Sequence, residues 1–167
     1  MNLKTKIIGI DPDIDKSGVC YLYSPTRQIE VKSLAFPELL EYLSEFEYDC
    51  NVIVVIEASW KTKHNWHGKW GDNRNIMAAK GYDVGRNHQT GQLVVEMCRH
   101  WKIPVWEKMP LKKIWRSRDG KITQEEIEQF VPHFPKRSNQ EVRDATLLAW
   151  DYAGFPIRVK PVKTGLI

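Results

Sequence analysis

The chain has 167 residues, of which 42% are apolar and 28% charged, a composition typical of a globular protein with one core. Its apolar runs reach only about five residues, far short of the roughly 20 needed to cross a membrane, so we expect no membrane partner. Cys20, Cys50 and Cys98 match neither a zinc motif nor a disulfide framework, and we expect reduced thiols. The N-terminus lacks a hydrophobic signal region, which predicts a cytoplasmic protein.

Basic charge is concentrated in the middle of the sequence. The net charge is +4, but residues 58–118 carry 13 Lys and Arg against 4 Asp and Glu, a local balance of +9. Six of the seven tryptophans lie in the same stretch. Basic side chains interleaved with aromatic ones suit a phosphate backbone and unstacked bases. The alternative is a solvated basic face over a partly buried aromatic cluster.

The first half of the chain predicts four strands and a helix. Residues 5–11 and 51–57 are β-branched runs typical of fully buried strands. Residues 19–23 and 28–33 predict two further strands joined by a hairpin, after a turn over residues 11–18. A helix is expected over residues 36–43, where Pro37 is tolerated in the first turn.

The second half begins with an irregular, Trp-rich insertion, which we expect at about residues 59–82 and which has room for a short helix. The rest predicts three helices, one short strand and a basic C-terminal tail. The helices are expected at 86–101, 123–130 and 139–152, the strand at 103–106 and the tail at 158–167.

This order predicts an α/β domain over residues 1–157, with a mixed sheet and helices on both of its faces. The two strands that end in an acid can lie side by side at the centre of the sheet. The last helix would then pack across them.

Four carboxylates in three places indicate a site for divalent metal. Asp11 and Glu57 end the two buried strands, and Glu141 and Asp144 share one face of the last helix. Carboxylates held close together repel one another, and Mg²⁺ or Mn²⁺ offsets that repulsion. Two ions could cleave a phosphodiester, with Asp11 bridging both, Glu57 holding one, and Glu141 and Asp144 the other.

Other metal and phosphate motifs fail. A calcium loop starting at Asp11 would need Gly and Glu where Lys16 and Leu22 stand. His64-x-x-His67 has no further ligand at metal spacing, so surface or DNA-facing histidines are the better interpretation. Residues 85–92 lack the Gly-Lys-Ser/Thr of a phosphate loop, although Arg86 and backbone amides could meet a phosphate at a helix N-terminus.

The sequence resembles the RuvC-like Holliday-junction resolvases of the RNase H-like nuclease superfamily over about residues 5–152. Ile8-Gly9-Ile10-Asp11-Pro12, with Ser17-Gly18-Val19, is similar to the family's opening motif. Further similarity lies in the second strand-end acid at 54–57, the central helix and strand at 85–107, the lysine-bearing segment at 110–113 and the closing acidic helix at 141–145.

The resemblance implies an RNase H-like fold with a five-stranded sheet, whose first three strands are antiparallel. It implies a homodimer that binds a four-way DNA junction and nicks two strands of like polarity, using two Mg²⁺ or Mn²⁺ ions per active site. Asp11, Glu57, Glu141 and Asp144 would be the catalytic ligands. Lys112 or Lys113 would contact the scissile phosphate, and the alignment fits both.

Several other side chains are expected to contact DNA, and Trp66 or Trp70 is a candidate for a wedge at the junction centre. The full set is Lys61, Lys63, Trp66, Lys69, Trp70, Arg74, Arg86, Lys112, Lys113, Arg116 and Arg118.

The sequence also departs from the family pattern. Asp13 stands where the family usually has Gly, and Glu141 replaces the more usual Asp. Lys121 is only the nearest match to a second expected basic residue.

Three alternatives stand beside a junction nuclease. The first is an RNA-processing nuclease of the same superfamily, acting on structured or ribosomal RNA. The second is a catalytically inactive protein that binds branched DNA. An ATP-binding sugar-kinase or actin-like domain is the third, but it needs about twice this length and glycines that are missing here. The expected setting is the nucleoid of a bacterial or phage-infected cell.

Overall fold

The computed structural model describes residues 5–62 and 71–158. Its elements, in chain order, are β1 Lys6–Asp11, β2 Ser17–Tyr23, β3 Gln28–Leu34, α1 Phe36–Ser44, β4 Val52–Glu57, the 3-10 turn η1 Ser59–Lys61, α2 Arg74–His100, β5 Val105–Lys108, α3 Gln124–Ile127 and α4 Gln140–Tyr152. Within the described ranges, no helix is long and apolar enough to span a membrane.

The strands form one mixed sheet in the order β3-β2-β1-β4-β5. β1 and β3 both run antiparallel to β2, while β4 runs parallel to β1 and β5 parallel to β4. This arrangement confirms the predicted α/β fold, its antiparallel first three strands and the central position of the two strands that end in an acid.

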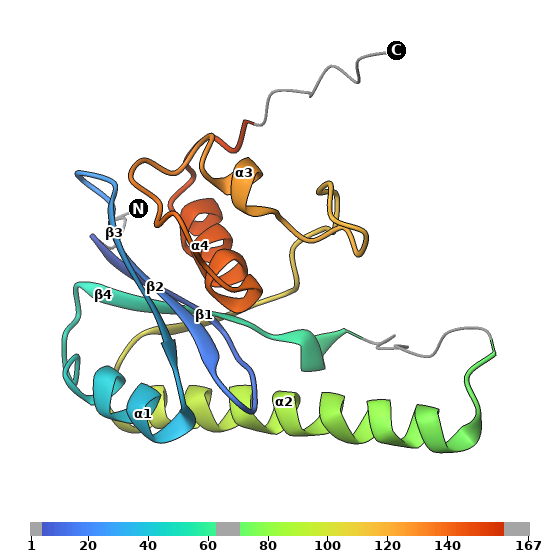
Figure 1. Cartoon of the computed structure of the whole chain (residues 1–167). Helices are drawn as coiled ribbons and strands as arrows, with labels where there is room; N and C mark the ends of the chain where they lie inside the picture. Colours follow the sequence, from blue (N-terminus) through green and yellow to red (C-terminus); the bar gives the residue numbers. More distant parts are fainter. Residues whose placement is uncertain (1–4, 63–70, 159–167) are drawn as a thin grey trace, which may run out of the picture.

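Helices cover both faces of the sheet, as Figure 1 shows, with α3 and α4 on one side and α1 and α2 on the other. Successive side chains of β1 point to opposite faces of the sheet and so belong to two separate cores. Ile7 packs under α4, whereas Ile8 and Ile10 pack against α1 and α2. Because both faces are covered, the central strands need apolar residues at successive positions, and this requirement explains their uninterrupted hydrophobic runs.

Helix α4 lies unusually close to the sheet because two glycines face it. A Cβ at Gly9 would lie 2.1 Å from the carbonyl oxygen of Ala145, and one at Gly18 would lie 2.0 Å from that of Glu141. The helix begins at its N-cap residue, Asn139, whose side chain accepts a hydrogen bond of 2.9 Å from the Val142 amide. These contacts place the first turn of α4 above the end of β1.

Helix α2 is longer than predicted and corrects two expectations. It begins at Arg74, where the Asn73 side chain caps it, so residues 74–82 are helical and not irregular. Gly81 and Gly85 each cost the helix about 1 kcal/mol, which the neighbouring helix formers outweigh. Residues 85–92 therefore lie inside the helix, where their amides are already bonded, and the expected phosphate site at a helix N-terminus is wrong.

Three predicted elements differ slightly in their bounds from the observed ones, and two predicted regions cannot be compared with the structure. Strand β5 lies two residues later than the predicted 103–106, and α3 is shorter than the predicted 123–130. Strand β2 begins two residues before the predicted 19–23. Part of the expected Trp-rich insertion and nearly all of the basic tail lie outside the described residues.

We expect Gly9→Ala to lower the free energy of unfolding by about 3 kcal/mol, because the added methyl meets backbone that cannot move aside. Gly81→Ala is the matched control, since nothing lies within 4 Å of its Cβ position. That change should instead raise stability by about 0.5–1 kcal/mol. Denaturant unfolding of both variants checks the pair, and equal stabilities would contradict the close packing of α4.

Candidate active site

A cavity of about 510 Å³ opens where the ends of β1 and β4 meet the first turns of α4. All four predicted carboxylates line it, namely those of Asp11, Glu57, Glu141 and Asp144. Three lysines of one loop also border it, at positions 112, 113 and 121. The fold thus brings together acids that are separated by more than 130 positions in the sequence.

Strand geometry places Asp11 and Glu57 next to each other. Ile10 and Ile56 are register partners in the parallel pair β1–β4, so the next residue of each strand lies at the same edge. Ile7 and Val55 both belong to the core beneath α4. Since side chains alternate along a strand, Asp11 and Glu57 point to that same face.

The two acids of α4 approach from above. Glu141 lies over Gly18, the register partner of Asp11 in the β1–β2 pair. Asp144 follows three residues later on the same helical face, and its side chain is 16% exposed.

Burial and mutual repulsion make this site electrostatically costly. Burial, followed by the charges of Glu57 and Asp144, raises the pKa of Asp11 well above its usual value. Burial and the charge of Asp144 likewise raise the pKa of Glu57. Positive charge at the site would relieve both effects.

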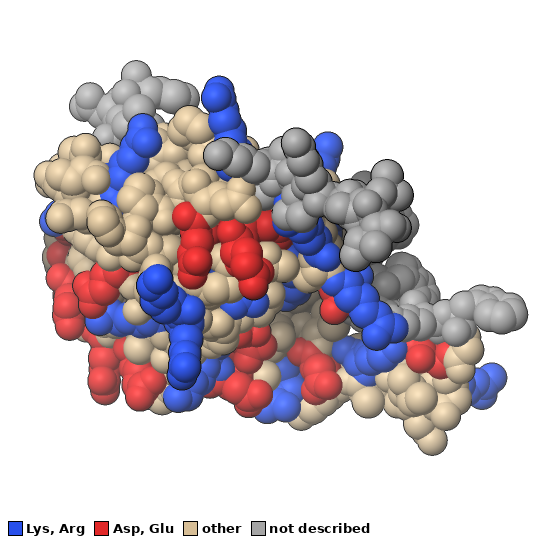
Figure 2. All heavy atoms as spheres, turned by 45° about the horizontal axis from the view of Figure 1, so that its top comes forward, with Lys and Arg blue, Asp and Glu red and all other residues tan. Residues whose placement is uncertain are grey.

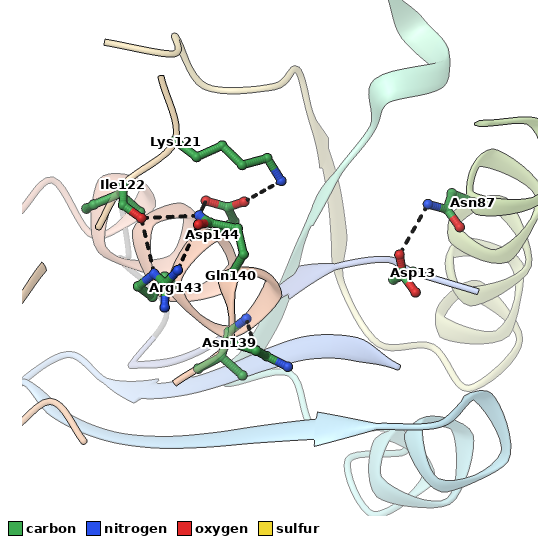
Figure 3. Close-up of polar contacts among 9 residues, drawn as sticks. Asp13, Asn87, Lys121, Ile122, Asn139, Gln140, Arg143 and Asp144 are labelled. Atoms are coloured by element: carbon green, nitrogen blue, oxygen red, sulfur yellow. Dashed lines mark hydrogen bonds and ion pairs between the residues drawn. The ribbon is translucent and has the colours of Figure 1, made fainter. Parts of the chain in front are cut away.

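Lys121 supplies part of that positive charge. Its ammonium lies 3.2 Å from Asp144 Oδ2, as Figure 3 shows. Burial lowers the pKa of Lys121, but the charges of Asp144 and Asp11 outweigh it and hold the pKa above its usual value. The charge of Lys121 also lowers the pKa values of Asp11 and Glu57. In the sequence, this residue was only the nearest match to an expected base.

The donor set fits a divalent metal in its chemistry, because carboxylate oxygens are the ligands that Mg²⁺ prefers. As the side chains are placed, no group of three His, Cys, Asp or Glu in the described part of the chain could hold one ion. Asp144 is directed to Lys121 and to the Gln140 amide. Asp11, Glu57, Glu141 and Asp144 are the residues that would hold a metal here.

The loop between β5 and α3 carries the lysines and is tied down at several points. Trp115 stacks on Phe130, with ring centroids 6.2 Å apart. The buried carboxylate of Glu126 accepts hydrogen bonds from the Arg116 and Thr123 amides. Lys113 lowers the pKa of Glu57 through its charge. Lys112 and Lys113 both line the cavity, but this effect favours Lys113 as the nearer to the acids.

Hydrogen bonds link the turn between β1 and β2 to α2 through residues that were not predicted to belong to the site. The Asn87 side chain accepts a hydrogen bond of 2.9 Å from the Ile14 amide and donates one of 3.3 Å to Asp13. Asp13 thus accepts a hydrogen bond that a glycine, which has no side chain, could not accept at this position. Asn87 and Asp13 are 74 positions apart, so no local pattern in the sequence predicts their hydrogen bond.

The residues expected to contact DNA lie in several places. Besides Lys112 and Lys113, Arg116 and Arg118 are exposed on the same loop, and Arg74 and Arg86 are exposed on α2. Two of these cations form ion pairs, Lys61 with Glu107 at 3.1 Å and Arg116 with Glu126 at 3.8 Å. The remaining four, Lys63, Trp66, Lys69 and Trp70, lie outside the described residues.

Basic and acidic groups are interspersed on the face that Figure 2 shows, although basic residues dominate the middle of the sequence. Some basic side chains of this stretch are paired with acids, since Lys61 and Arg99 both pair with Glu107. Trp60 and Trp101 pack against the core on the α2 side. These two tryptophans are therefore partly buried, as the alternative interpretation expected of the aromatic residues.

Comparison with solved structures finds a similar fold. RuvC of T. thermophilus, in a complex with a Holliday junction substrate, aligns with a TM-score of 0.50 and 14% sequence identity. The alignment covers 87% of this chain and 90% of that one. No protein-family model and no curated protein matches the chain. Together with the sheet order, this likeness shows that the chain has the RNase H-like fold.

We expect Asp11→Asn to stabilise the metal-free protein at neutral pH. The raised pKa of Asp11 means that its charged form is disfavoured in the folded state. The variant should gain about 1.4 kcal/mol for each unit by which that pKa is raised. The gain should be absent below the unfolded-state pKa near 4, grow as the pH rises from there to the folded-state pKa, and stay constant above it.

Thermal unfolding in chelator from pH 4 to pH 8 measures this effect. The exposed acid of the same turn provides a control, because Asp15→Asn should leave the melting temperature almost unchanged. A melting temperature that falls in Asp11→Asn at pH 8 would contradict the proposed repulsion.

Proposed function

We propose that this protein is a metal-dependent endonuclease that cleaves Holliday junctions or other branched DNA in recombination and repair. The observation that carries the proposal is the meeting of four carboxylates around one cavity of an RNase H-like fold. Lysines at the border of that cavity suit a polyanionic substrate.

The residues of the cavity have distinct parts in this proposal. Two Mg²⁺ or Mn²⁺ ions would supply the chemistry that activates water and stabilises the leaving oxygen during an in-line displacement at phosphorus. Asp11, Glu57, Glu141 and Asp144 would hold them. Lys113 or Lys112 would offset the charge of the scissile phosphate.

A DNA junction is favoured over RNA by the solved relative with the same fold, which was bound to a Holliday junction. The exposed cations on the lysine loop and on α2 would contact the strands on either side of the cut. An RNA-processing nuclease would use the same carboxylates, so the substrate has to be tested directly.

We expect the wild-type protein to nick a labelled four-way junction in Mg²⁺ or Mn²⁺ and to leave 5′-phosphates that a ligase can seal. Asp11→Asn should reduce the rate about 1,000-fold, since metal-assisted cleavage is worth several kcal/mol. Asp15→Asn should cleave at nearly the wild-type rate.

Gel assays with junction DNA, duplex DNA and structured RNA separate the alternatives. Cleavage of RNA alone would favour an RNA-processing nuclease. Junction binding with no cleavage in either metal would favour an inactive binding protein. Either of these two results would refute the proposal.

The nuclease is further proposed to act as a homodimer, which would give one active site for each of two strands. The first turns of α2 support this idea. Residues 73–79 are all exposed, and Ile76 and Met77 are 43% and 41% exposed. Apolar side chains on a helix exposed on every side gain stability when another surface covers them.

Changing both Ile76 and Met77 to Glu should convert a dimer into a monomer of unchanged helix content. Light scattering after size-exclusion chromatography measures the mass, and circular dichroism measures the helix content. Tyr48→Glu is the control, because Tyr48 is 70% exposed but lies in the turn after α1. A wild-type protein with the mass of one chain would refute the dimer.

A further inference from the structure

The side-chain amide of Gln140 joins a carboxylate of the cavity to the segment that carries Lys121. Its Nε2 donates a hydrogen bond of 2.8 Å to Asp144 Oδ1 and a second, of 3.2 Å, to the carbonyl oxygen of Ile122. Ile122 directly follows Lys121, whose ammonium approaches the other oxygen of Asp144. Figure 3 shows these residues around the first turn of α4.

Arg143 fixes which way this amide is turned. Its guanidinium donates a hydrogen bond of 2.8 Å to Gln140 Oε1 and another, of 3.1 Å, to the Ile122 carbonyl oxygen. A further bond of 2.8 Å to the Ser138 carbonyl oxygen holds the guanidinium itself. Arginine only donates, so a flipped amide would oppose donor to donor at Arg143 and acceptor to acceptor at Asp144.

We propose that Gln140 is a positioning residue, which orients Asp144 as a metal ligand and sets the distance between Asp144 and Lys121. This inference rests on the proposed function, because it assigns Asp144 to a metal. Gln140 itself would touch neither metal nor substrate.

The two contacts of the amide explain how it would act. With Oδ1 bound to Gln140, the Asp144 carboxylate keeps one orientation, and Oδ2 is the oxygen left to face Lys121 or an ion. The bond to Ile122 anchors the main chain beside Lys121 to the same helix turn. Groups that hydrogen-bond to ligating carboxylates commonly change metal affinity or activity 10- to 100-fold when they are removed.

A second glutamine provides a matched control. Gln124 Nε2 donates to Glu128 and to the Pro135 carbonyl oxygen, and its Oε1 accepts from Ser138. It therefore makes three hydrogen bonds, as Gln140 does, but it contacts none of the four carboxylates. Replacing each glutamine by Met removes these bonds at nearly constant volume.

The experiment measures Mn²⁺ affinity by calorimetry, kcat and KM for junction cleavage, and the melting temperature in chelator. We expect Gln140→Met to lower Mn²⁺ affinity and kcat by about 10-fold, with KM within about twofold of wild type. Gln124→Met should leave Mn²⁺ affinity and kcat unchanged, even if both variants lose some thermal stability.

The Arg143→Met variant keeps Gln140 but allows the Gln140 amide to flip. This variant tests the inference if Gln140→Met does not fold. It should weaken Mn²⁺ binding in the same direction, and the double variant should be no weaker than Gln140→Met alone. Wild-type Mn²⁺ affinity in Gln140→Met would overturn the inference, as would an equal loss in Gln124→Met. A wild-type protein that binds no Mn²⁺ would overturn the proposed function and this inference together.

Discussion

The close approach of α4 to β1 and β2 determines where the acids of the site lie relative to one another. Gly9 and Gly18 leave no side chain between strand and helix, so the helix backbone rests almost directly on the sheet. This contact brings Glu141 and Asp144 over the ends of the strands that carry Asp11 and Glu57. A larger residue at either glycine would push the helix outward and separate the two pairs of acids.

Bringing the four acids together lowers the free energy of unfolding of the protein. Burial and repulsion raise the pKa values of Asp11 and Glu57, which means that their charged forms cost free energy in the folded protein. The positive charge of Lys121 offsets part of this cost, because it lowers the pKa values of both acids. The core beneath α4 and the second core beneath α1 and α2 must supply the remainder, and residues kept in spite of such a cost are typical of functional sites.

The local sequence predicted an element correctly where a single physical cause, such as burial on both faces of the sheet, determined its residues. Fully buried strands need consecutive β-branched residues, so 5–11 and 51–57 were predicted to within a residue. The start of α2 was missed because Gly81 and Gly85 interrupt it and because a helix that projects from the core leaves no hydrophobic period to detect. The cap at Asn73 was a signal for the start of the helix, but it lies in a stretch that was predicted to be mostly irregular.

The two strand ends and the acidic pair on α4 could be recognised from the amino-acid sequence, and with them the kind of chemistry that the site can support. Carboxylates at the ends of buried strands are costly enough to stand out without a structure. The cation that meets these acids could not be recognised in the same way, because Lys121 and the Gln140–Arg143 pair reach Asp144 through contacts between a loop and a helix. Loop conformation depends on packing partners such as Phe130 and Glu126, and no local pattern in the sequence encodes those.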